Sequence, residues 1–123
     1  MPNQPPTSLH AAFELALNSA DLEALTALYE PEAVLSQPTA PVSGWDAIRK
    51  AYRGVLALKP QIRVETLGML DTAEGLALLH GRWTMTGTGP DGVEIRMEGR
   101  NTEVVRRQPD GSWRYLIDDP FAP

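Results

Sequence analysis

The chain has 123 residues, a formal net charge of −5 and no cysteine. That length suits one domain with a single hydrophobic core, and 42% hydrophobic with 22% charged residues is the balance of an ordinary globular protein. The lack of cysteine excludes disulfides, thiolate metal sites and a cysteine nucleophile. The acidic charge argues against nucleic acid or an anionic membrane surface as a partner.

The ends of the chain differ in composition from the middle. Residues 1–7 are polar and proline-rich and lack the basic and apolar regions of a signal peptide. No apolar run approaches the roughly 18 residues that span a membrane, so we expect a cytoplasmic protein without a membrane partner. Residues 1–7 are predicted to be flexible, residues 8–119 to form one domain, and residues 120–123 to form a short tail.

Three helices are predicted in the first half of the chain. Apolar residues recur there with helical spacing over three segments, 9–20, 22–29 and 46–58. Thr7 or Ser8 can cap the first helix and Asp21 the second. Pro31 follows the second helix as a stop, and a short strand is expected over residues 33–36.

The second half of the chain alternates with the period of a strand. Four strands are predicted, at residues 61–70, 76–86, 93–107 and 112–118. The turns between them contain Glu74-Gly75, Pro90-Asp91-Gly92 and Pro109-Asp110-Gly111. Because short turns join neighbouring strands antiparallel, we expect an α+β fold with a mostly antiparallel sheet.

Both faces of this sheet are predicted to carry apolar residues. Trp83 is out of phase with Leu78 in the second strand, and in the last strand Tyr115 and Ile117 are expected on the face opposite Asp118. The helices can cover one face. A second subunit is the simplest cover for the other, so a homodimer through the outer sheet face is expected.

The third predicted strand holds the clearest sign of a binding site. Ile95 and Met97 share a face that, in unchanged phase, continues with Asn101 and Glu103. An apolar face that becomes polar part-way along a strand indicates the wall of a pocket, because a buried amide or carboxylate needs a partner. A carboxylate between apolar walls suits acid–base chemistry. The alternative is a β-bulge near Gly99, which would turn Glu103 to solvent.

Two further residues are candidate acids or bases. His80 lies within a strand and is either a pocket acid–base group or a hydrogen-bonded wall residue. Asp118 precedes Asp119, and paired carboxylates can share a proton or bind a cation; the alternative is a solvated strand end. His10 stands at i, i+4 spacing from Glu14 and is interpreted as part of the helix surface.

The order of these segments resembles a known superfamily. The residues that carry the resemblance are 18–25 (NSADLEAL), 28–34 (LYEPEAV), 42–44 (VSG) and 110–114 (DGSWR). Over about residues 8–119 the chain resembles the nuclear transport factor 2-like superfamily, and within it the SnoaL-like and ketosteroid-isomerase-like bacterial proteins. The resemblance implies a cystatin-like α+β roll, in which a curved sheet and three helices form a cone around a small-molecule pocket. It also implies a dimer through the outer face of the sheet.

The resemblance extends to the catalytic positions only in part. The base of the isomerases falls at Gln37, whose amide cannot act as a general base. Their catalytic tyrosine falls at Phe13, which cannot donate a hydrogen bond. Their oxyanion-hole aspartate falls at Glu103, which keeps a carboxyl group, and their supporting tyrosines match Tyr29 and Tyr52. The resemblance therefore implies a pocket lined by these residues and Asn101, without standard steroid isomerisation.

Two hypotheses about function follow. In the first, the protein is a cofactor-free isomerase, cyclase or dehydratase that acts on a small hydrophobic or carbonyl-containing molecule. Glu103 is then the acid or base, His80 or Asp118 assists, and no metal is required. In the second, the protein is a non-catalytic ligand-binding or accessory dimer, as the loss of two catalytic positions suggests. A pure dimerisation module with a filled cone is a third reading, because a fold does not fix a reaction.

Overall fold

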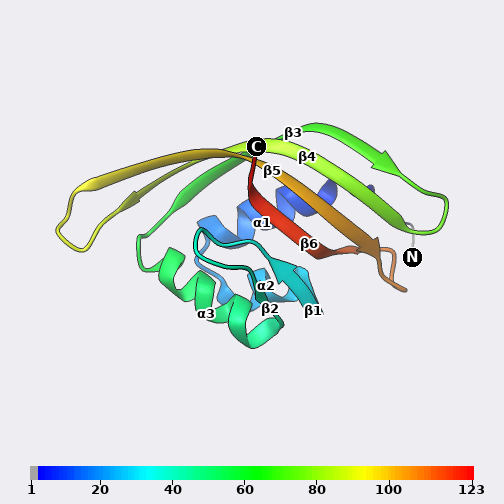
Figure 1. Ribbon diagram of the computed structural model, residues 1–123, viewed down its shortest axis with the longest axis horizontal. Helices are drawn as coiled ribbons and strands as arrows, with labels where there is room; N and C mark the ends of the chain where they lie inside the picture. The colour runs from blue at the N-terminus through cyan, green and yellow to red at the C-terminus, as the bar shows by residue number, and fades with distance from the viewer. Residues whose placement is uncertain (1–2) are drawn as a thin grey trace.

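A computed structural model describes residues 3–123. The helices are α1 (Ser8–Asn18), α2 (Leu22–Ala27) and α3 (Trp45–Leu56). The strands are β1 (Tyr29–Leu35), β2 (Val42–Ser43), β3 (Gln61–Asp71), β4 (Leu76–Thr88), β5 (Glu94–Arg107) and β6 (Trp113–Ala122). They form one sheet in the order β2-β1-β6-β5-β4-β3, and the helices pack against one of its faces (Figure 1). The predicted α+β class is confirmed.

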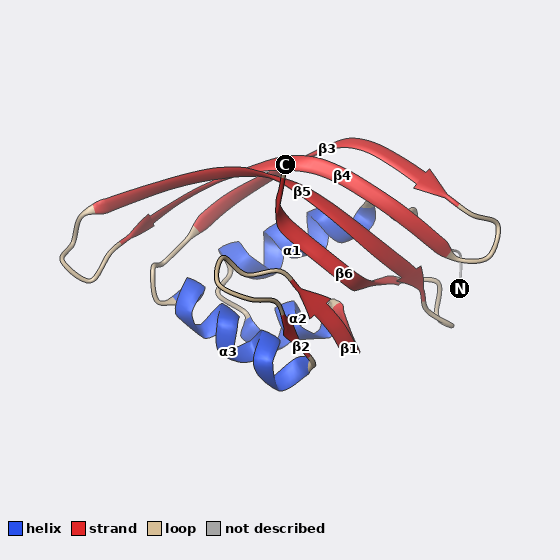
Figure 2. Cartoon of the chain, viewed as in Figure 1, coloured by secondary structure: helices blue, strands red, loops and turns tan. Residues whose placement is uncertain are grey.

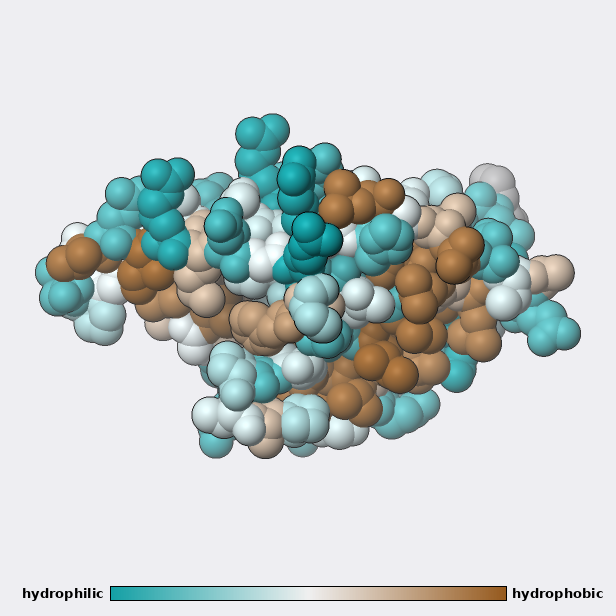
Figure 3. All heavy atoms as spheres, turned by 45° about the horizontal axis from the view of Figure 1, so that its top comes forward, coloured by the Kyte–Doolittle hydropathy of each residue, from teal (hydrophilic) through white to brown (hydrophobic). Residues whose placement is uncertain are grey.

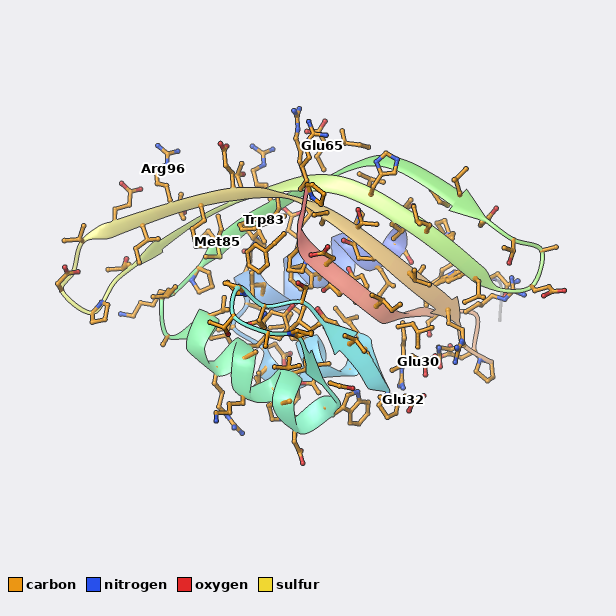
Figure 4. All side chains as sticks on the ribbon, in the orientation of Figure 1. Glu30, Glu32, Glu65, Trp83, Met85 and Arg96 are labelled. Carbon is orange, nitrogen blue, oxygen red and sulfur yellow. The ribbon has the colours of Figure 1, made fainter. Side chains whose placement is uncertain are left out.

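The long strands β3, β4 and β5 pair antiparallel and curve over the helices (Figure 2). Buried and exposed residues alternate along β4, as the sequence predicts. Trp83 and Met85 point from the sheet toward the helices, whereas Glu65 and Arg96 point away from them (Figure 4). The sheet therefore has an inner face that meets the helices and an outer face that none of the described elements covers.

The predicted hairpin turns are present. Gly92 and Gly111 have φ values of 81° and 87°, a left-handed conformation that costs glycine little because it has no Cβ. β1 breaks the antiparallel pattern, since it runs parallel to its neighbour β6. The chain can place β1 there because α3 and the three long strands intervene between β1 and β6.

The first strand begins earlier than the sequence pattern predicts. Helix α2 ends at Ala27, and Tyr29 opens β1 instead of completing the apolar stripe of the helix. Tertiary contacts override the helical spacing here: Tyr115 donates its backbone N–H to the carbonyl of Leu28 at 2.8 Å, and the indole of Trp45 donates to the carbonyl of Tyr29 at 2.9 Å. The expected stop after the helix, Pro31, consequently lies inside the strand.

The predicted phase of the last strand is wrong beyond Tyr115. Val105 pairs with Tyr115 but Val104 pairs with Ile117, so one residue of β6 is left unpaired as a bulge. The bulge turns Ile117 outward, where 47% of its surface is exposed, and turns Asp118 inward. The strand also continues to Ala122, so most of the expected tail belongs to the sheet.

The amino-terminal segment touches the same strand. Gln4 donates its backbone N–H to Gly111 at 3.0 Å and accepts the indole N–H of Trp113 at 2.7 Å. The rest of the segment predicted to be flexible includes residues 1–2, which lie outside the described residues. Within residues 3–123, no helix has the length and apolar character needed to cross a membrane.

Candidate functional site

A cavity of about 370 Å³ lies between the inner face of the sheet and helices α1 and α3. Most of its wall is apolar and aromatic: Phe13 comes from α1, Val55 from α3, Trp83 and Met85 from β4, and Phe121 from the end of β6. Polar side chains gather on one part of the wall, from α1, β5 and β6. An apolar cavity with a few convergent polar groups is the usual form of a small-molecule site.

The first polar group joins α1 to β5. His10 Nε2 and Glu103 Oε1 are 2.5 Å apart, and Asn101 Nδ2 donates to Glu103 Oε2 at 2.7 Å. All three side chains are buried. Each carboxylate oxygen of Glu103 therefore has its own hydrogen-bond partner, which offsets the cost of burying the charge.

Thr66 extends this group to the edge strand β3. Its Oγ1 lies 2.6 Å from His10 Nδ1, so both ring nitrogens of His10 have partners. The carboxylate and the hydroxyl together fix the orientation of the imidazole ring. His10, Glu103 and Thr66 thus form a hydrogen-bonded chain from the cavity wall to an exposed residue of the sheet edge.

The second polar group joins α3, β1 and β6. The hydroxyls of Tyr29 and Tyr52 lie 2.6 Å apart, and the hydroxyl of Tyr29 donates to Asp118 Oδ2 at 2.5 Å. Packing supports the group, because the rings of Tyr29 and Tyr115 have centroids 5.0 Å apart. The Asp118 carboxyl faces the cavity and is 6% exposed.

Burial changes the protonation of this second group. Desolvation, followed by repulsion from Glu103, raises the pKa of Asp118 to about 8, although the hydrogen bond from Tyr29 acts in the opposite direction. Desolvation likewise raises the pKa values of Tyr29, Tyr52 and Tyr115, with the charge of Asp118 as the second cause. The Asp118 carboxyl therefore keeps its proton to a higher pH than an ordinary aspartic acid, which suits it to donate a proton.

In the structure, β5 has the phase that places Asn101 and Glu103 on the inner face of the sheet. β4 and β5 pair without a shift in register past Gly99, so no bulge turns Glu103 to solvent. Four of the other predicted residues also line the cavity: Phe13, Gln37, Tyr52 and Asp118. Tyr29 lies behind Tyr52 and Asp118, fully buried.

Both histidines lie where the sequence interpretation did not put them. His80 is exposed on the outer face, with its ring over Gly68, so it is not a cavity residue; the strict alternation of β4 directs it away from Leu79 and Trp83. His10, interpreted as helix surface, is 4% exposed and lines the cavity. Its spacing of three and seven residues from Phe13 and Leu17 could have identified it.

The polar groups of the wall do not form a metal cluster. Among residues 3–123, no three or more His, Asp or Glu side chains lie together in an arrangement that could hold a metal ion.

A curved sheet packed against three helices defines the class of fold to which the chain belongs, and solved structures share this fold. A ketosteroid isomerase-like protein from Erwinia carotovora atroseptica matches with a TM-score of 0.80 and 22% identity, covering 96% of this chain and 95% of that one. A nuclear transport factor 2-like superfamily protein from Salmonella enterica matches with a TM-score of 0.79 and 19% identity, covering 92% and 84%.

A protein with a cystatin-like fold from Caulobacter vibrioides has a TM-score of 0.75 and 21% identity, over 92% of this chain and 83% of that one. At these identities the likeness establishes the fold alone. A comparison with curated protein sequences found no match. The SnoaL-like domain model matches residues 9–116, and the chain belongs to that family.

Proposed function

We propose that the protein is a cofactor-independent acid–base enzyme of the isomerase, cyclase or dehydratase kind, acting on a small, mostly apolar molecule. One observation carries this proposal: two buried carboxyl groups, Glu103 and Asp118, lie on one wall of an otherwise apolar cavity, each with its own hydrogen-bond partners. Two carboxyls in different environments can take different protonation states, which is how one site supplies both an acid and a base.

The roles follow from the partners. Asp118, neutral because of its burial, is the proton donor to an oxygen atom of the substrate. Glu103 is the proton acceptor, and His10 and Asn101 orient it. The assisting histidine in this proposal is His10 and not His80. Gln37 and Phe13 line the cavity, where they contact the substrate without exchanging protons.

The test uses no knowledge of the substrate. A small-molecule extract of the native host is incubated with the protein in D2O and compared by mass spectrometry with a protein-free sample. We expect compounds that gain deuterium or lose water with the wild type but not with Glu103→Gln or Asp118→Asn. Glu98→Gln is the matched control, because Glu98 lies exposed on the outer face of β5. Unchanged turnover in Glu103→Gln would refute the proposed role of Glu103.

The second candidate function is ligand binding without turnover. Gln37 and Phe13 favour it, since Gln37 cannot act as the base and Phe13 cannot donate the hydrogen bond that the residues of the isomerases supply at these positions. This candidate predicts that a small molecule co-purifies from the native host, is seen by native mass spectrometry, and is released unchanged in the D2O experiment.

We also propose that a second copy of the chain covers the outer face of the sheet. Cross-strand pairing aligns one residue from each of β3, β4, β5, β6 and β1 in a row on this face: Leu70, Leu78, Val104, Ile117 and Val34. Four of the five are exposed, and the row contains no charge. Apolar side chains gather on one side of the outer face beside a hydrophilic region (Figure 3). The same apolar row on a second copy is a partner of matching chemistry.

A further inference from the structure

The internal hydrogen bonds of the cavity wall account for most of its polar atoms. Glu103 is satisfied by His10 and Asn101, and His10 by Glu103 and Thr66. The indole of Trp83 donates to the carbonyl of Pro120 at 2.7 Å. The polar atoms that remain can be expected to select the ligand, because those already paired inside the protein have little to gain from it.

One remaining atom is the side-chain oxygen of Asn101. Asn101 is 5% exposed and lines the cavity, yet its Oδ1 has no hydrogen-bond partner. Its orientation is fixed, because Nδ2 donates to Glu103 Oε2 at 2.7 Å. Turning the amide round would place Oδ1 against the carboxylate of Glu103, an acceptor against an acceptor.

An unsatisfied buried carbonyl is costly and needs a donor. The described cavity wall includes no Lys or Arg, and its mostly apolar lining cannot replace the hydration that an anionic ligand would lose. We propose, on the basis of the function proposed above, that the ligand of this cavity is a neutral molecule with an O–H or N–H group that donates to Asn101 Oδ1. Asn101 is then the specificity-determining residue, and molecules without a donor are poor ligands.

Three naphthalene probes of similar size test the proposal: 1-naphthol has a donor, 1-methoxynaphthalene lacks it, and 1-naphthoate is an anion. Each is titrated into the ¹⁵N-labelled protein, and dissociation constants are taken from the chemical shifts of the backbone and side-chain amides. We expect 1-naphthol to bind about tenfold more tightly than 1-methoxynaphthalene, as one buried hydrogen bond allows. The anion should bind most weakly. The Asn101 side-chain amide should shift with 1-naphthol and much less with the ether.

Two variants identify the residue that causes the preference for 1-naphthol over the ether. Asn101→Ala should abolish the preference for 1-naphthol over the ether, whereas Gln37→Leu should preserve it, since Gln37 is the other cavity residue with an uncommitted amide oxygen. If Asn101→Ala does not fold, the chemical shifts of the Asn101 side-chain amide in the wild type still test the proposal. Those shifts report directly on the atom in question.

The outcomes separate this inference from the proposed function. Equal affinity for the alcohol and the ether, or tightest binding of 1-naphthoate, overturns the role of Asn101 but leaves a ligand-binding cavity. A selectivity that disappears in Gln37→Leu and survives in Asn101→Ala overturns it as well. If none of the three probes shifts any cavity resonance, the cavity does not bind small apolar molecules, and the proposed function is overturned together with this inference.

Discussion

Tyr29 places one hydroxyl between two buried groups, Tyr52 and Asp118. Tyr29→Phe should therefore destabilise the protein by about 1–3 kcal/mol, because Tyr52 and Asp118 are each left with an unmet hydrogen bond in an apolar environment. The free energy of unfolding in urea measures the loss. Tyr115→Phe is the matched control, since the Tyr115 hydroxyl makes only a long contact of 3.4 Å with the carbonyl of Leu9. Equal losses in the two variants would contradict the importance of the Tyr29 hydroxyl.

Asp118 makes stability depend on pH. Burial raises the pKa of its carboxyl to about 8, so between the unfolded pKa of about 4 and the folded pKa the native protein holds a proton that the unfolded chain releases. The contribution of this group to stability is therefore constant below about pH 4, falls as the pH rises toward 8, and is constant again above.

Asp118→Asn removes this titration. Between pH 5 and pH 8 the free energy of unfolding of the variant, relative to that of the wild type, should rise by more than about 1 kcal/mol. Urea unfolding of both proteins at the two pH values measures the difference. A constant difference between them would show that Asp118 is ionised in the folded protein at pH 5.

At the level of elements, Asn18 connects the end of α1 to the start of β3. Its side chain donates to the carbonyl of Ile62 at 3.0 Å and accepts the N–H of Ile62 at 2.7 Å, as a neighbouring strand would. Asn18→Ala should cost about 1–3 kcal/mol, since two backbone groups lose their partners. Ser19→Ala, at the exposed next position, should change the free energy of unfolding by less than about 0.5 kcal/mol. Similar urea midpoints for the two variants would refute this connection.

The sequence predicts the elements of this fold well because each has its own periodicity and its own turn residues. It fails where contacts between distant segments decide. The bulge in β6 forms because the strand must pair with β5 and β1 together. No local sequence pattern around Asp118 predicts this bulge. Likewise, His10 is buried because the curved sheet brings Glu103 over α1, and helical spacing from Glu14 cannot show this.

The residues of the candidate site could be predicted from the sequence only as far as the phase of the strands could. Asn101 and Glu103 follow from the alternation along one strand, which runs without interruption past Gly99. The hydrogen-bonded groups around them require residues from α1, α3 and β1, whose approach is a property of the folded chain. A single sequence therefore identifies the wall of the site more readily than the partners of its residues.

In the whole molecule, the curvature of the sheet gives its two faces different environments. The inner face surrounds the aromatic core and the cavity. Glycine allows neighbouring strands to approach closely there, since a Cβ at Gly81 would lie 2.3 Å from the carbonyl oxygen of Glu65. The outer face is left without cover across several strands (Figure 1). The apolar half of that face is where a partner gains most by excluding water.

The row Leu70, Leu78, Val104, Ile117 and Val34 therefore predicts the oligomeric state. We expect light scattering to give twice the chain mass for the wild type. Leu70→Lys and Ile117→Lys should give the mass of a monomer, since each would bury an unpaired ammonium in the interface. Both residues are exposed in the single chain, so the fold itself should tolerate the charge, as circular dichroism can verify. Thr84→Lys, on the hydrophilic half of the same face, should remain a dimer. A wild type that is monomeric at high concentration would rule out this interface, and a dimer that survives both row substitutions would place the contact elsewhere on the molecule.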